Sequence, residues 1–69
     1  MSRLKNLGLN IKKYREKKGL TQINVAVKLG LSYEYISRVE HGQKYMSLRK
    51  LFEMADLLGV KFSDLMNFD

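Results

Sequence analysis

Hydrophobic residues along this chain recur at intervals of three and four, the spacing of one face of an α-helix. The first stretch shows the pattern at Leu4, Leu7, Ile11 and Tyr14. Residues 17–19, Lys-Lys-Gly, then end it as helices commonly end, with cations opposite the C-terminal dipole and a glycine in the left-handed cap. Gly8 disfavours helix by about 1 kcal/mol relative to alanine, which places the start of regular helix near this residue.

Glycines at positions 19, 30, 42 and 59 punctuate the rest of the chain. Hydroxyl side chains that can cap the first turn of a helix follow three of them, at Thr21, Ser32 and Ser47. The apolar positions of these helices are Val25, Ala26, Leu29, Ile36, Val39, Leu48, Leu51, Phe52, Ala55 and Leu58. Ser63 is the candidate cap of a short fifth turn containing Leu65 and Met66. No stretch alternates long enough to indicate a sheet, so the pattern predicts an all-α fold, a compact bundle of five short helices.

Composition narrows the class of protein. At 69 residues we expect a single domain over residues 1–69. A domain of this size buries only about 60% of the surface that its unfolded chain exposes. We therefore expect marginal stability unless another subunit or a ligand contributes. The absence of cysteine excludes disulfides and thiolate metal clusters, and one histidine argues against a zinc site. We therefore expect no metal, no cofactor and no small-molecule ligand. His41 has no nucleophile partner at hand and no phosphate-binding loop is present, so an enzyme is not expected. No signal peptide or spanning segment is visible, which predicts a cytoplasmic protein.

The net charge of +6 is unevenly distributed. Residues 1–50 contain twelve of the thirteen Lys and Arg and three of the seven acidic residues, whereas residues 51–69 contain one basic residue and four acidic ones. This uneven distribution of charge favours one basic surface that binds a polyanion and a second surface that makes a different contact. Charge alone leaves open a simpler interpretation, in which the basic residues, including the lysines at positions 12, 13, 17 and 18, only keep the protein soluble.

Residues 21–42 combine two helices of about nine residues with a connection of only three, Gly30-Leu31-Ser32. Such a short connection requires close, steeply crossed packing, for which Ala26 supplies a small side chain at the contact. Gly30 permits the positive φ that reverses the chain sharply. The segment is therefore predicted to be a helix-turn-helix, and the second helix, residues 32–40, to project an exposed face.

The chain resembles the phage-repressor and Cro-like (XRE-type) helix-turn-helix family at an ordered set of positions. The matching residues are Gly19-Leu20-Thr21-Gln22, Ala26, Leu29-Gly30-Leu31-Ser32, Tyr35-Ile36-Ser37-Arg38-Val39-Glu40-His41-Gly42, Ser47-Leu48, Leu51, Ala55 and Leu58-Gly59-Val60. The likeness covers about residues 7–66. It implies a lambda-repressor-like fold and a sequence-specific, double-stranded DNA-binding transcriptional regulator, a repressor or autoregulator that binds a palindromic operator as a dimer.

The resemblance also implies roles for residues of the recognition helix, residues 32–40. Tyr33, Glu34, Ser37 and Arg38 match positions that contact bases. Arginine can donate two hydrogen bonds to guanine, and glutamate can accept one from cytosine. Two residues of this helix also allow an interpretation without base contact. Glu34 is a favourable acid in the first turn of a helix, and Tyr35 lies nearer the apolar side, where packing is the simpler role.

Positions around this helix match phosphate contacts of the family. They are Gln22, Ser32, His41, Gln43 and Lys44. Arg15 and Glu40 match a buried structural ion pair between the first and third helices. Three residues depart from the family pattern. Ile23 and Val27 are apolar where polar residues are usual, which leaves either a small exposed patch or packing of Ile23 on the first helix, and Met46 stands where proline is common.

The C-terminal residues 59–69 are rich in apolar side chains set among acidic ones. We expect a homodimer that uses the fourth helix and this segment, with contacts from Phe62, Leu65, Met66 and Phe68. An alternative is an antitoxin or another protein-interaction module that binds a partner protein through the same surface. Family antitoxins usually carry an extra neutralising segment, and none is evident in the sequence.

Overall fold

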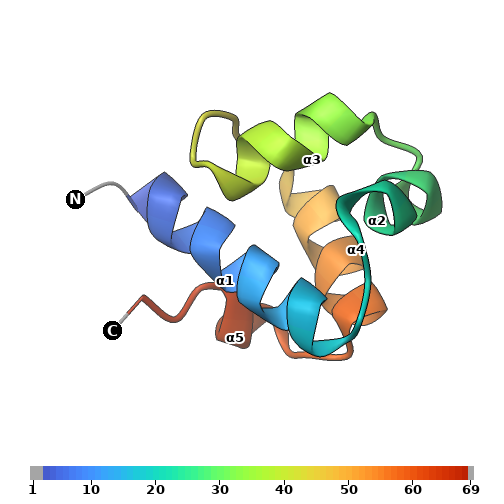
Figure 1. The fold of residues 1–69 in the computed structure, drawn as a ribbon. Helices are drawn as coiled ribbons and strands as arrows, with labels where there is room; N and C mark the ends of the chain where they lie inside the picture. The colour runs from blue at the N-terminus through green and yellow to red at the C-terminus, as the bar shows by residue number, and fades with distance from the viewer. Residues whose placement is uncertain (1–2, 69) are drawn as a thin grey trace.

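The computed structural model describes residues 3–68, and every regular element in that range is a helix. Figure 1 shows five of them wrapped around one core, with both ends of the described chain on the same side of the molecule. In order, they are α1 (Arg3–Lys17), α2 (Gln22–Leu29), α3 (Tyr33–Glu40), α4 (Leu48–Leu58) and α5 (Phe62–Leu65). The predicted all-α fold of five short helices is confirmed.

Local hydrogen bonds set the starts of the middle helices where the sequence predicted them. Thr21 Oγ1 accepts from the Asn24 N–H at 3.0 Å, and Asn24 Oδ1 accepts in return from the Thr21 N–H at 3.0 Å. Ser32 and Ser47 cap α3 and α4 in the same way, each accepting at 3.1 Å from the backbone N–H three residues on. These caps satisfy backbone donors that the first helical turn leaves without a partner.

Two predicted helix starts were wrong. Helix α1 begins at Arg3 and continues through Gly8, so this glycine does not mark the start of the helix. A Cβ at Gly8 would stand 2.4 Å from the carbonyl oxygens of Val39 and Glu40, so only glycine lets α1 approach the end of α3. Helix α5 begins at Phe62, and Ser63 lies inside it; the Lys61 N–H instead donates to Asp64 Oδ2 at 2.9 Å.

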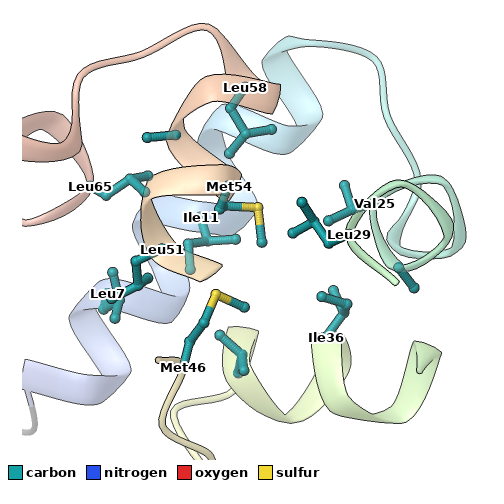
Figure 2. Packing of buried hydrophobic residues seen from close by; sticks show 13 residues of the cluster. Leu7, Ile11, Val25, Leu29, Ile36, Met46, Leu51, Met54, Leu58 and Leu65 are labelled. Carbon is teal, nitrogen blue, oxygen red and sulfur yellow. The ribbon is translucent and has the colours of Figure 1, made fainter. Parts of the chain in front are cut away.

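All five helices contribute to a single hydrophobic core. Ile11 of α1 and Met54 of α4 are completely buried at its centre, and Figure 2 shows side chains from α2, α3 and α5 converging on them. Met46, just before α4, fills the side of the core near Leu51. Because α2 and α3 both bury apolar side chains in this core, the orientation of the helix-turn-helix is fixed relative to the rest of the protein.

The apolar stripe predicted for α4 divides into two parts. Leu51, Ala55 and Leu58 are buried, together with Met54, but Leu48 is 60% exposed and Phe52 is 49% exposed. The Phe52 ring stacks on the Phe62 ring of α5, with centroids 4.5 Å apart and planes 26° apart. Helix α4 therefore has one apolar face in the core and a second that faces outward. None of the helices in the described range combines the length and apolar character needed to cross a bilayer.

Candidate nucleic-acid interface

Helices α2 and α3 are joined by the sharp turn predicted for a helix-turn-helix. Gly30 adopts φ +68°, and the Leu31 N–H donates to the Ala26 carbonyl at 2.9 Å across the turn. Ala26, Val25 and Ile36 are all buried in the core, as their spacing predicted. A side chain larger than alanine at position 26 would push the two helices apart, so this residue sets their close approach.

The outer face of α3 presents side chains that can recognise nucleic-acid bases. Tyr33, Glu34 and Arg38 are exposed, and Figure 1 shows α3 along one edge of the molecule. Ser37 is half-buried on the same helix, and its carbonyl accepts from the His41 N–H at 3.1 Å. The face thus offers a guanidinium, a carboxylate, a phenol and a hydroxyl within two helical turns.

Arg15 and Glu40 form the ion pair between α1 and α3 that the resemblance implied. Arg15 Nε donates to Glu40 Oε2 at 2.6 Å and Nη2 donates to Oε1 at 3.1 Å. The two residues are only 8% and 4% exposed, and Nη1 of Arg15 donates to the Leu20 carbonyl at 2.8 Å. The hydrogen bond to Glu40 raises the pKa of Arg15 against the opposing effect of desolvation, so the guanidinium stays charged inside the protein.

Gln22 extends this network to α2. Its Nε2 donates to Glu40 Oε1 at 2.9 Å, so the carboxylate of Glu40 receives hydrogen bonds from two other segments of the chain. A primary amide has two N–H donors, and this bond uses one of them. The side chain of Gln22 is therefore held in place at the start of α2 with a second N–H still available to an outside acceptor.

The loop after α3 carries the remaining predicted phosphate contacts. His41, Gln43 and Lys44 are all exposed. His41 Nδ1 lies 2.7 Å from the Ser37 carbonyl oxygen, so Nδ1 carries the proton of that hydrogen bond and Nε2 is the ring nitrogen left for another partner. The Gln43 N–H donates to the Arg38 carbonyl at 2.8 Å, which ties this loop back to the recognition helix.

Several of the residues predicted for base and phosphate contact lie together in the structure. A hollow of about 380 Å³ is lined by Ser32, Glu34, Tyr35, Arg38 and Lys44. The sequence pattern placed Tyr35 nearer the apolar side of its helix and favoured packing over base contact, and the ring does pack against the core. The hydrogen bond from its hydroxyl to the Tyr45 carbonyl, 2.7 Å long, was missed because no local pattern links a helix to a loop ten residues away.

One of the four residues predicted for a dimer contact is placed elsewhere. Leu65 is completely buried in the core, with its side chain reaching from α5 toward α4 in Figure 2, so it cannot touch a second copy. Met66 is exposed, and Phe62 and Phe68 are half-buried. The structure adds Leu48 and Phe52 of α4 as exposed apolar side chains near them, since Phe52 stacks on Phe62. Of the two arrangements predicted for Ile23, the structure shows the exposed one, since Ile23 and Val27 are both exposed on α2.

Comparison with known proteins decides the family. A family model described as helix-turn-helix matches residues 11–65, which include α2, α3 and α4. The chain belongs to the Cro/C1-type (XRE) helix-turn-helix family. This Cro/C1-type chain is 37% identical over 65 residues to an HTH-type transcriptional regulator from Sinorhizobium fredii, an alignment that covers 94% of the chain and 84% of that relative.

Solved structures extend the Cro/C1-type likeness to three dimensions. The restriction-modification controller protein C.AhdI from Aeromonas hydrophila superposes with a TM-score of 0.84 at 32% identity, covering 90% of this chain and 94% of that one. SinR, a master regulator for biofilm formation solved in complex with DNA, superposes with a TM-score of 0.81 at 29% identity, covering 88% and 98%. This Cro/C1-type protein is therefore a transcriptional regulator with a helix-turn-helix DNA-binding domain.

Proposed function

We propose that this regulator is a repressor or autoregulator that binds a palindromic operator as a homodimer, with α3 in the major groove. The observation that carries the proposal is the exposed face of α3, with Gln22 hydrogen-bonded to Glu40 at the C-terminal end of that helix and the loop 41–44 directly after it. An α-helix fits the major groove of B-DNA, where each base pair presents a distinct set of donors and acceptors. Occupation of an operator is sufficient to block transcription from an overlapping promoter.

Base recognition is assigned to the exposed side chains of α3. Arg38 donates two hydrogen bonds to guanine O6 and N7, and Glu34 accepts from cytosine N4. Tyr33 packs on a thymine methyl group, and Ser37 contacts a base through its hydroxyl. Arg38 and Glu34 both line the hollow described above, so they would approach the same stretch of groove. The arginine contact is worth about 1–3 kcal/mol of discrimination between bases.

Phosphate contacts are assigned to the residues around α3. The free N–H of Gln22 donates to a phosphate while its other N–H stays with Glu40. Ser32 at the start of α3, and His41, Gln43 and Lys44 in the loop, bind the backbone on either side of the groove. Such contacts place α3 in register without reading sequence, and the cationic contact from Lys44 also releases condensed counterions, so affinity falls as salt rises.

Self-association is assigned to the outward apolar face of α4 and the segment that follows it. Leu48, Phe52 and Met66 are exposed, and Phe62 and Phe68 are half-buried. The Phe62 ring stacks on the Phe52 ring, and Phe68 and Met66 line one groove. Isolated exposed apolar side chains are common, but several gathered on two adjacent helices are typical of an interface. A two-fold dimer would present two α3 helices to half-sites about 34–36 Å apart.

Selection of bound sites from a random double-stranded DNA library tests the proposal. We expect enrichment of a palindrome with half-sites separated by about one helical turn. The variant Arg38→Ala should lose enrichment at one position of each half-site, whereas Lys28→Ala on the outer face of α2 should enrich the same sites as the parent. A pool that shows no enriched sequence after several rounds would overturn sequence-specific binding, and an enriched single half-site would overturn the dimer.

A further inference from the structure

The loop between α3 and α4, residues 41–47, joins the recognition helix to the rest of the core. Figure 1 shows it as the yellow segment that extends beyond the end of α3. It has no regular secondary structure beyond turns, yet it carries His41, Gln43 and Lys44, which the proposed function assigns to DNA phosphates. A loop of this kind binds phosphate more tightly when it is already held in the bound conformation, because ordering it on binding costs free energy.

The structure holds the two ends of this loop firmly. At the start, the Gln43 N–H donates to the Arg38 carbonyl, and Gly42 packs so closely on α1 that a Cβ there would stand 2.6 Å from Lys5 Cα. At the far end, Met46 is buried in the core and Ser47 caps α4. Lys44 and Tyr45 lie between these anchors, and both are exposed.

Tyr35 supplies the contact that holds the middle of the loop. Its hydroxyl donates to the Tyr45 carbonyl at 2.7 Å, a bond that spans ten residues of sequence. This hydrogen bond reaches the loop backbone between Lys44 and Met46, at the carbonyl of Tyr45. The half-buried ring of Tyr35 is fixed against the core and lines the hollow that separates Arg38 from Lys44. The Tyr35 side chain thus connects α3 to the carbonyl of Tyr45, the residue that follows Lys44, and we call this connection the strut.

We propose that Tyr35 is a positioning residue for DNA binding: its hydroxyl fixes the Tyr45 carbonyl and thereby holds Lys44 at the distance from Arg38 that phosphate and base contacts require together. The inference rests on the proposed function, since it assigns the position of one of the phosphate-binding side chains. It requires no contact between Tyr35 and DNA.

The test removes only the hydroxyl, in the variant Tyr35→Phe. We expect affinity for the selected operator to fall about fivefold, the loss expected for one hydrogen bond. The plot of log affinity against log salt concentration has a negative slope, and its magnitude should decrease by about one, because the Lys44 contact is lost or loosened. Tyr14→Phe, which removes a hydroxyl from a half-buried tyrosine of α1, is the matched control and should leave affinity and slope unchanged.

A double-mutant cycle separates positioning through Lys44 from a general loss of stability. Lys44→Ala should decrease the magnitude of the salt slope by about one. The double variant Tyr35→Phe/Lys44→Ala should bind no more weakly than Lys44→Ala alone. Thermal unfolding of all variants is measured alongside. Parental affinity and slope in Tyr35→Phe, or additive losses in the double variant, would overturn the proposal.

Nuclear magnetic resonance relaxation of the free protein distinguishes failure of this inference from failure of the proposed function. We expect the order parameters of the amides of residues 43–45 to fall in Tyr35→Phe and to stay at parental values in Tyr14→Phe. If the parent protein binds no DNA, the proposed function fails, and the relaxation data still show whether the strut holds the loop. Unchanged order parameters in Tyr35→Phe would overturn the strut.

Discussion

Arg15 on α1 and Glu40 at the end of α3 lie 25 residues apart in sequence and share two hydrogen bonds, 2.6 and 3.1 Å long, in a region almost closed to solvent. Gln22 adds a third hydrogen bond to the same carboxylate from α2. The pair therefore fixes the recognition helix relative to both helices that precede it. Because Gln22 is the residue proposed to bind a phosphate at the start of α2, loss of the Glu40 carboxylate would affect both protein stability and the position of the Gln22 side chain.

The variant Glu40→Gln should lower the free energy of unfolding by about 3–5 kcal/mol. It leaves the Arg15 guanidinium buried without an anionic partner, and an unpaired buried charge costs more than the pair contributes. Denaturant unfolding followed by circular dichroism measures the change. Arg49→Gln is the control, since Arg49 is exposed and lies 4.0 Å from Glu53, and it should change stability by less than about 0.5 kcal/mol. Equal effects of the two variants would contradict the structural role assigned to Glu40.

The variant Gly8→Ala should destabilise the protein by about 1–3 kcal/mol, although alanine is the better helix former. The added Cβ would stand 2.4 Å from backbone carbonyl oxygens at the end of α3, so the two helices must separate. Thermal unfolding gives the result directly. Lys12→Ala, at an exposed position of the same helix, should be neutral or slightly stabilising. A higher melting temperature for Gly8→Ala would show that helix propensity outweighs the close packing.

The variant Arg38→Ala should relax recognition at one base pair of each half-site. Affinity for the selected operator should fall by about 1–3 kcal/mol, and affinity for a scrambled duplex should fall much less. Fluorescence anisotropy at two salt concentrations measures both. Equal losses on the operator and on the scrambled duplex would mean that Arg38 binds the backbone and reads no base.

The variant Leu48→Glu should weaken the proposed dimer at least about tenfold, because it places a charge on the outward apolar face of α4. Analytical ultracentrifugation over a concentration series measures the dissociation constant. Ile23→Glu is a matched control, since Ile23 is 59% exposed on α2, close to the 60% of Leu48, and it should not alter self-association. A parent protein that stays monomeric up to near-millimolar concentration, with and without operator, would remove the dimer from the proposed function.

The variant Leu65→Ala should act on folding and not on association. Leu65 is completely buried, and truncation of a buried leucine costs about 2–5 kcal/mol. Met66→Ala, one residue further on and exposed, should change the free energy of unfolding by less than about 0.5 kcal/mol. Chemical denaturation at several protein concentrations separates the two effects, since a variant that alters association changes how the midpoint depends on concentration, whereas one that alters folding alone does not. A Leu65→Ala protein as stable as the parent would contradict its place in the core.

The amino-acid sequence by itself determined the helices and the family. Thr21, Ser32 and Ser47 start their helices through hydrogen bonds that span only three residues, and Gly30 reverses the chain through its own φ. Features of this kind depend on neighbouring residues alone, so the linear pattern was enough to place the helix-turn-helix at residues 21–42. The residues expected to face DNA followed from the same ordered pattern.

Tertiary structure decided which apolar positions are covered and which polar groups meet. The sequence placed Leu48 in the apolar stripe of the fourth helix and Leu65 at a dimer contact, yet Leu48 is mostly exposed and Leu65 is completely buried. Gly8 read as a weak point of a helix and is instead the contact that lets α1 reach α3. The strut from Tyr35 to Tyr45 joins a helix to a loop. The physical reason is common to all three, because burial and long-range hydrogen bonding depend on how neighbouring helices cross, and helical periodicity carries no information about that crossing.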